Sequence, residues 1–287
     1  MTRRLFLASG PAAIGLAQQA QNPSPMVEHT RPHPRLQKPV PELPGRREKL
    51  ELGTLFIPAK LAGRKTIPLF VHFHGGDWLP EVAAAKSGSA VISVQAGSGS
   101  GVYAKRFEDK ALFGAVLREA ESKTGVSFGT VTLTAWSAGH GAIREILAVP
   151  GHYERVSNVL LIDGMHTGYE GGKPGPLESK LQPDHLEIFL KFARDAVAGR
   201  KRMIVTHSEI FPGTFASTTE TADWLLAQLG IPRRTSLRTG PMGTQQLSEA
   251  RRGWFRLVGY AGNSAPDHVD QFHSLPEYLA WFRQPGL

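Results

Sequence analysis

The stretch Leu133-Thr134-Ala135-Trp136-Ser137-Ala138-Gly139-His140 decides how this chain folds. Residues 130–135, rich in Thr and Val, predict a β-strand, and the small residues after Ser137 predict the start of a helix. A serine between a strand and a helix, with small residues two positions before and after it, has the form of a nucleophile elbow. Small neighbours are required there because the serine backbone is strained and the helix passes close to the strand. Ala135 stands in place of the usual first Gly and adds only a methyl group, so the stretch predicts a reactive serine hydroxyl.

Composition and charge limit the possible classes of protein. The chain has 287 residues, of which 41% are hydrophobic and 20% charged, which is typical of a globular protein and excludes global disorder. The net charge of +8 would suit a nucleic-acid binder, but residues 1–50 hold eight Lys and Arg against three Glu and so supply most of it. A basic groove is therefore not indicated in the rest of the chain, and we expect no nucleic-acid partner. The sequence has no cysteine, which excludes disulfides and cysteine chemistry.

The N-terminal part carries a targeting pattern rather than a fold pattern. Residues 2–7, Thr-Arg-Arg-Leu-Phe-Leu, resemble a twin-arginine export signal, and the apolar run after them is too short to span a bilayer. We expect residues 1–20 to be a signal peptide, with export to the periplasm or the medium; a frayed amphipathic N-terminus is the alternative. Residues 21–48 contain seven prolines and predict a linker or extended arm, which leaves 49–287 for the folded domain.

From residue 50 onward, strand and helix patterns alternate. Strands are predicted at 50–57, 67–73, 90–94, 131–135, 156–162, 202–206 and 254–260. Helices are predicted at 104–123, 138–149, 184–197 and 219–229, with a last helix after Ser274, where Glu277 completes a capping-box pattern. This alternation predicts an α/β domain whose mostly parallel central sheet has helices on both faces.

Reactive residue types follow several of the predicted strands. His-Gly-Gly at 74–76 follows the strand 67–73, Ser137 follows 131–135, and Asp163 follows 156–162. His268 lies beyond the last strand. Carboxyl ends of parallel strands meet at one edge of a sheet, where reactive groups gather. A hydroxyl nucleophile needs a base, an acid that orients the base, and amide donors for an oxyanion, and all four occur here.

In these motifs and in their order, the sequence resembles the α/β-hydrolase superfamily, in its serine esterase and lipase branches. The resemblance covers roughly residues 50 to 287 and implies an α/β-hydrolase fold with Ser137 as the nucleophile. It also implies that the N–H of Ala138 is one oxyanion donor and that Gly75 or Gly76 supplies the second. Asp77 follows where some esterases have a further Gly, which leaves the choice between the two glycines open.

The base and the acid each have two candidates. We favour His268 as the base, because family members place the catalytic histidine after the last strand, whereas His273 precedes the predicted helix cap. For the acid, most members would nominate Glu209, and a minority, including pancreatic-type lipases, would nominate Asp163. We favour Asp163, since it ends a strongly apolar strand; its alternative role is to cap a turn.

Other residues near the predicted site have both a functional and a packing interpretation. Trp78 and Trp136 flank the oxyanion loop and the serine, so they are expected to bind an acyl or aromatic group, with core packing nearly as good an explanation. His72 and His74 are spaced like half of a metal site. We prefer the interpretation that His74 braces the oxyanion loop and His72 packs in the sheet. His166 and His207 are interpreted as rim or packing residues.

These observations predict a serine hydrolase that cleaves small-molecule carboxylic esters through an acyl-enzyme. The resemblance implies no metal and no organic cofactor, and after export we expect no membrane insertion. The sequence does not indicate the oligomeric state. The alternatives are a peptidase or amidase with the same triad, a metal-dependent hydrolase that uses His72, His74, Asp163 and His207, and a non-catalytic binding protein on a hydrolase scaffold.

Overall fold

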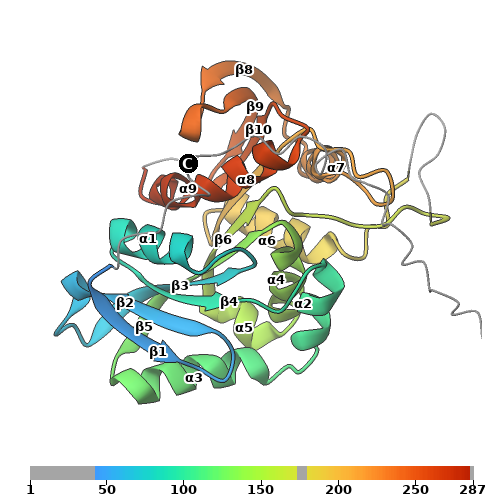
Figure 1. Cartoon of the computed structure of the whole chain (residues 1–287). Coiled ribbons are helices and arrows are strands. Elements are labelled where there is room, and N and C mark those ends of the chain that lie inside the picture. Colours follow the sequence, from blue (N-terminus) through green and yellow to red (C-terminus); the bar gives the residue numbers. More distant parts are fainter. Residues whose placement is uncertain (1–42, 173–179, 285–287) are drawn as a thin grey trace, which may run out of the picture.

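The strand order of the central sheet matches the predicted fold class. The computed structural model describes residues 43–172 and 180–284, so the predicted signal peptide and most of the predicted arm lie outside it. Within the described residues a ten-stranded sheet has the order β1-β2-β4-β3-β5-β6-β7-β10-β9-β8 (Figure 1). From β4 to β10 neighbouring strands are parallel, and the pairs at both ends of the sheet are antiparallel. The prediction of an α/β-hydrolase fold is confirmed.

The strands are β1 Gly45–Lys49, β2 Thr54–Pro58, β3 Thr66–Phe73, β4 Ala90–Val94, β5 Ser127–Trp136, β6 Val156–Ile162, β7 Arg202–His207, β8 Arg234–Thr239, β9 Gln245–Arg252 and β10 Phe255–Tyr260. The helices are α1 Trp78–Ser87, α2 Ser100–Arg106, α3 Leu112–Thr124, α4 His140–Leu147, α5 Pro150–Arg155, α6 Glu187–Val197, α7 Thr218–Leu229, α8 Ala265–His273 and α9 Leu275–Trp281. Short 3₁₀ turns are η1 Ala59–Leu61, η2 Ser137–Gly139 and η3 Pro241–Gly243.

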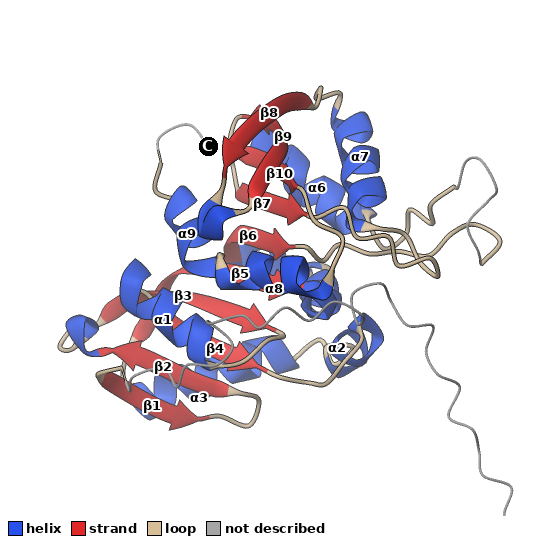
Figure 2. Cartoon of the chain, turned by 45° about the horizontal axis from the view of Figure 1, so that its top comes forward, coloured by secondary structure: helices blue, strands red, loops and turns tan. Residues whose placement is uncertain are grey.

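Helices cover both faces of the sheet. Alternate residues of the central strands point to opposite faces, and each face has its own buried apolar cluster. The larger cluster joins the sheet to the helices α2 to α7, and the smaller one joins it to α1, α8 and α9. Figure 2 shows α1, α8 and α9 together on one side of the sheet. None of the helices in the described ranges is both long and apolar enough to cross a bilayer.

The register of the central strands brings the predicted reactive positions to one edge of the sheet. Phe73 of β3 pairs with Ala135 of β5, and Trp136 pairs with Ile162 of β6. Ile162 in turn pairs with Thr206 of β7. The residues that follow these partners therefore leave the sheet side by side, which places the ends of β3, β5, β6 and β7 around a common point.

Three features at the start and middle of the chain differ from the sequence prediction. β1 begins inside the segment 21–48 that the sequence predicts to be an arm, because Gly45–Lys49 pairs along β2 as an edge strand, so the folded part begins before residue 49. The predicted helix 104–123 is two helices, α2 and α3. The sequence does not predict the strands β8 and β9, because charged and polar residues dominate both and neither contains a run of apolar residues.

The end of the chain also differs. The capping box forms at Ser264 and Asp267, at the start of α8, whereas Ser274 makes no side-chain cap for α9. The hydroxyl of Ser274 donates instead to the carbonyl of Asp270. His268 therefore lies in the first turns of a helix and not in a loop, so its position is fixed by helical hydrogen bonds.

Candidate active site

Ser137 has the strained backbone of a nucleophile elbow. Its φ is +49°, in the left-handed region that non-glycine residues rarely adopt, and it lies between the end of β5 and the start of α4. Glycines allow two close approaches there: a Cβ on Gly139 would lie 2.2 Å from the carbonyl oxygen of Phe73, and one on Gly164 would lie 2.2 Å from that of Ser137. The ring of His140 donates from Nδ1 to the Ser137 carbonyl at 2.9 Å. The turn is thus held from three sides.

We expect Gly164→Ala to destabilise the protein, because its new methyl group would overlap the Ser137 backbone. Overpacking of this kind costs about 1–3 kcal/mol, and here backbone atoms must move to relieve it. Urea unfolding measures the loss. Gly151→Ala is the matched control, since nothing lies within 4 Å of a Cβ at that position. Equal midpoints for the two variants would show that the elbow is not tightly packed.

Asp163 and His268 form a hydrogen-bonded pair. Nδ1 of His268 lies 2.7 Å from Oδ2 of Asp163, whose side chain is only 2% exposed. Asp163 also accepts hydrogen bonds from the Ser208 N–H at 2.8 Å, the Ser208 hydroxyl at 2.7 Å and the Thr218 hydroxyl at 2.8 Å. Burial alone would raise the pKa of Asp163, but the hydrogen bond and charge of His268, together with the two Ser208 bonds, hold that pKa well below its usual range. The carboxylate is therefore ionised at neutral pH.

This pair lies against the elbow. The Nε1–H of Trp136 donates to the carbonyl of His268 at 3.0 Å, and the two ring centroids are 4.6 Å apart. Trp136 directly precedes Ser137, and Gly164, which directly follows Asp163, packs on the Ser137 backbone. Asp163 occupies Nδ1 of His268, so Nε2 is the nitrogen available to the serine hydroxyl. In the described part of the chain that last hydrogen bond is not formed; such bonds often tighten only when substrate binds.

The His-Gly-Gly segment forms a second strained turn beside the elbow. His74 has a φ of +73° and Gly75 a φ of +107°, and the His74 N–H donates to the Val94 carbonyl at 3.1 Å. A Cβ on Gly75 would lie 2.4 Å from the ring of Phe272, so this position requires glycine. Among the described residues, neither Gly75 nor Gly76 donates its N–H to a backbone carbonyl. Both amides can therefore serve an anionic oxygen.

The histidines of β3 support this turn. The Nε2–H of His72 donates to the His74 carbonyl at 2.7 Å, and its Nδ1 accepts from the Thr134 hydroxyl at 2.7 Å. The ring of His74 stacks on Trp136, with centroids 5.2 Å apart. Residues 43–172 and 180–284 contain no group of three or more His, Cys, Asp or Glu side chains placed to hold a metal ion. The four residues of the metal-dependent alternative do not gather, and His72 and His74 act as braces.

Burial keeps two histidines around the site, His72 and His140, neutral. It lowers the pKa of His72 from its ordinary 6.5 to about 3, and burial together with the charge of His166 does the same to His140. The folded chain therefore resists protonation that the unfolded chain accepts below pH 6.5. The stability that these groups contribute is fully present above pH 6.5 and is lost as the pH falls from 6.5 toward 3.

We therefore expect the free energy of unfolding to fall by about 1.4 kcal/mol per pH unit for each of the two histidines below pH 6.5. Urea unfolding at a series of pH values between neutrality and pH 5 measures this slope. His72→Gln keeps hydrogen-bonding groups at the site but removes one titration, so it should reduce the slope by about 1.4 kcal/mol per pH unit. A flat profile in the unchanged protein would contradict the assignment of neutral, buried rings.

The remaining predicted residues lie in three places. Glu209 is exposed after β7, where its backbone N–H donates to the Gly262 carbonyl, and its side chain lines a different cavity together with His207. Nε2 of His207 accepts from Arg233 at 2.8 Å. His273, at the end of α8, packs edge-on against Trp78, with ring centroids 5.4 Å apart. Neither Glu209 nor His273 is a partner in the Asp163–His268 hydrogen bond.

His166 and Trp136 lie beside the elbow. The His166 ring packs edge-on against His140 and the exposed Phe215, and its Nδ1 donates to the Ala216 carbonyl. Trp136 contacts the rings of His74, His268 and Phe272, so it links the His-Gly-Gly turn to the helix that carries His268. This arrangement favours packing over substrate contact for most of its surface.

Sequence reasoning missed the residues that hold Asp163. Ser208 directly follows β7, and Thr218 is the first residue of α7. The position of Ser208 at a strand end was a usable signal, since Asp163 and Ser208 follow neighbouring strands. The sequence contains no signal for Thr218, because its contact with Asp163 depends on how the loop before α7 folds.

Comparison with known proteins gives similarities of fold. No protein-family model matches the sequence, and no curated protein sequence matches it. An ester hydrolase from the metagenome of Lake Arreo is similar in structure, with 14% identity and a TM-score of 0.46 over 85% of this chain and 83% of that one. An acetyl xylan esterase from Aspergillus awamori (15%, TM-score 0.45) covers 80% of this chain and 93% of its own. A soluble variant of monoglyceride lipase from Saccharomyces cerevisiae (11%, 0.41) covers 88% and 99%. These likenesses concern the arrangement of the chain only.

Proposed function

We propose that this protein is a serine hydrolase that cleaves carboxylic esters through an acyl-enzyme. The observation that carries the proposal is the 2.7 Å hydrogen bond between His268 and a buried, ionised Asp163, directly beside the strained turn of Ser137. A buried carboxylate on Nδ1, with a nucleophilic residue next to the ring, is the arrangement that activates a hydroxyl.

In the proposed reaction, Ser137 Oγ attacks the ester carbonyl while Nε2 of His268 takes its proton. Asp163 keeps the remaining ring proton on Nδ1 and stabilises the charged ring that forms. The N–H groups of Ala138 and of Gly75 or Gly76 donate to the oxyanion of the tetrahedral intermediate. His268 then returns the proton to the leaving alcohol. A water molecule activated by the same ring releases the acid.

Small or soluble esters are the proposed substrates. The connection between residues 164 and 183 is Gly- and Pro-rich in sequence and lacks the long apolar run of a lipase lid. We include export in the proposal because of residues 2–7. A fusion of residues 1–48 to a reporter that matures only when transported folded would test it: the reporter should leave the cytoplasm, and Arg3→Lys/Arg4→Lys should retain it there.

The direct test of the activity is covalent labelling with a fluorophosphonate. We expect the reagent to attach to Ser137, as located by mass spectrometry of the digested protein. A panel of esters graded by acyl length and aromatic character, with matched amides, would then define the substrate class. Faster cleavage of the amides would favour the peptidase alternative. A folded protein that the reagent does not label would favour the non-catalytic one.

A further inference from the structure

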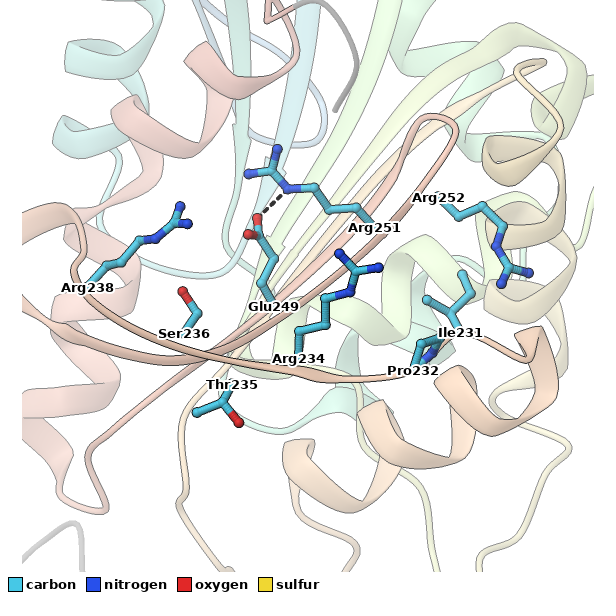
Figure 3. Close-up of a pocket in the computed structure, with 9 residues that line it drawn as sticks. All are labelled: Ile231, Pro232, Arg234, Thr235, Ser236, Arg238, Glu249, Arg251 and Arg252. Atoms are coloured by element: carbon cyan, nitrogen blue, oxygen red, sulfur yellow. Dashed lines mark hydrogen bonds and ion pairs between the residues drawn. The ribbon is translucent and has the colours of Figure 1, made fainter.

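A cationic cavity lies at the edge of the sheet formed by β8 and β9. Its volume is about 430 Å³, and its lining includes four arginines and a single carboxylate (Figure 3). The arginines are Arg234, Arg238, Arg251 and Arg252, and the carboxylate is Glu249. None of the lining residues belongs to the candidate active site.

Strand register places three of these arginines on one face. Arg234 pairs across the strands with Glu249, and Arg238 pairs with Gln246. The register between β8 and β9 shifts between these two pairs, and so does the register between β9 and β10. Glu249 pairs with Val258 of β10 and Gln246 with Tyr260. Val258 and Tyr260 are alternate residues of one strand, so both pairs lie on the same face of the sheet. Arg251 lies two residues beyond Glu249 on β9 and therefore shares this face.

These three arginines form a row along the strands. At about 3.4 Å per residue, Arg238 and Arg234 are separated by roughly 10 Å, and Arg251 lies about 7 Å farther on. A single small anion can contact only one arginine of such a row. The spacing therefore suits an extended ligand whose negative charges repeat along its length.

Two of the cations have no protein partner within the described residues. Arg252 donates to the carbonyls of Leu229 and Gly230 at the end of α7, and Arg251 is paired with Glu249. Arg234 and Arg238 make no ion pair or side-chain hydrogen bond to any described residue, and both are exposed. Charged residues on an edge strand also prevent edge-to-edge pairing. That role does not require a cavity or a common face.

Glu249 defines the kind of anion. One of its carboxylate oxygens, Oε1, accepts from Arg251 and, at 2.9 Å, from the buried Arg256. Glu249 repels any anion, but it repels a densely charged phosphate chain more strongly than a chain with one carboxylate per sugar, and it can accept hydrogen bonds from the hydroxyl groups of the sugars. Among the described residues that line the cavity none is aromatic, so bases would find no stacking surface. The lining thus favours a ligand that carries carboxylates and hydroxyls together.

We propose that this cavity binds a linear acidic polysaccharide, a chain of sugars that bear carboxylates. Arg234 and Arg238 form ion pairs with two separate carboxylates of the same chain, and Glu249 and Ser236 bind sugar hydroxyls. The proposal goes beyond esterase activity and does not depend on it, since no catalytic group takes part.

Calorimetric titration of the full chain with a galacturonic acid oligomer long enough to span the row tests the proposal. We expect binding that weakens as ionic strength rises, and no binding of a neutral glucose oligomer of equal length. Arg234→Gln/Arg238→Gln should raise the Kd by at least about tenfold, because two charged hydrogen-bonding groups are lost. Ser137→Ala should bind as well as the unchanged protein, which separates this site from the proposed activity.

The matched control is Arg64→Gln/Lys65→Gln. It removes the same charge from an exposed turn just before the start of β3, and neither residue lines the cavity. Equal weakening by the two double variants would show that only net charge matters and would overturn the proposal. Absence of binding at low ionic strength would also overturn it. Tighter binding of a single-stranded oligonucleotide or of polyphosphate than of the uronate chain would do so as well.

Discussion

Ser137→Ala is expected to lower kcat on a small activated ester by roughly ten thousandfold to a millionfold. The variant keeps the Cβ and the backbone of the strained turn and removes only the attacking oxygen. The oxyanion amides and the Asp163–His268 pair remain, so a small residual rate above the uncatalysed reaction should persist. Steady-state kinetics with a chromogenic acetate ester measure the loss.

Two controls make this result decisive. The urea midpoint of Ser137→Ala should match that of the unchanged protein, which excludes unfolding as the cause. Ser100→Ala removes a hydroxyl from the start of the neighbouring helix α2 and should retain activity. Full activity in Ser137→Ala would mean that another group carries the reaction.

Asp163→Asn is expected to lower kcat by roughly ten thousandfold, with the fold preserved. The Asn carbonyl can replace Oδ1 and accept from the Ser208 N–H and the Thr218 hydroxyl. Its amide then stands where Oδ2 meets His268 and donates to Nδ1. The ring proton is forced onto Nε2, which can no longer take the proton of the serine hydroxyl.

Glu209→Gln is the matched variant for this experiment. It makes the same change from carboxylate to amide on an exposed residue after β7, and kcat should stay within about twofold. The contrast in kcat between the two variants decides between the two acids. If Glu209→Gln lost the activity and Asp163→Asn kept it, the role proposed for Asp163 would be wrong.

The architecture could be predicted from the sequence because its signals are local. The apolar runs of β3, β6 and β7 are typical of strands buried on both faces, and each ends at a polar residue. Parallel strands then bring those ends together whatever the intervening loops do. Ser137 and Asp163 could therefore be placed at one edge before the structure was known.

The choice between Asp163 and Glu209 could not be made from the sequence. Both follow buried strands, and the difference lies in donors that converge on Asp163 from distant positions, such as Ser208 and Thr218. The arginine row was missed for a similar reason. After residue 50 the chain holds 25 Lys and Arg against 22 Asp and Glu, so net charge alone indicates no cationic site, whereas the pairing of β8 with β9 gathers arginines on one face.

Left-handed backbone at strand ends sets a limit on how this protein can be stabilised. His74, Ser137 and Asp163 end three neighbouring strands, and each has a positive φ, at a cost of roughly 1–3 kcal/mol per residue. Glycine adopts this conformation without steric conflict, so the backbone at these three positions would be relaxed by the one residue that has no side chain. Selection for heat resistance alone would therefore erode the site first at Ser137, whose hydroxyl makes no hydrogen bond within the described residues, whereas the hydrogen bonds that Asp163 accepts oppose its replacement.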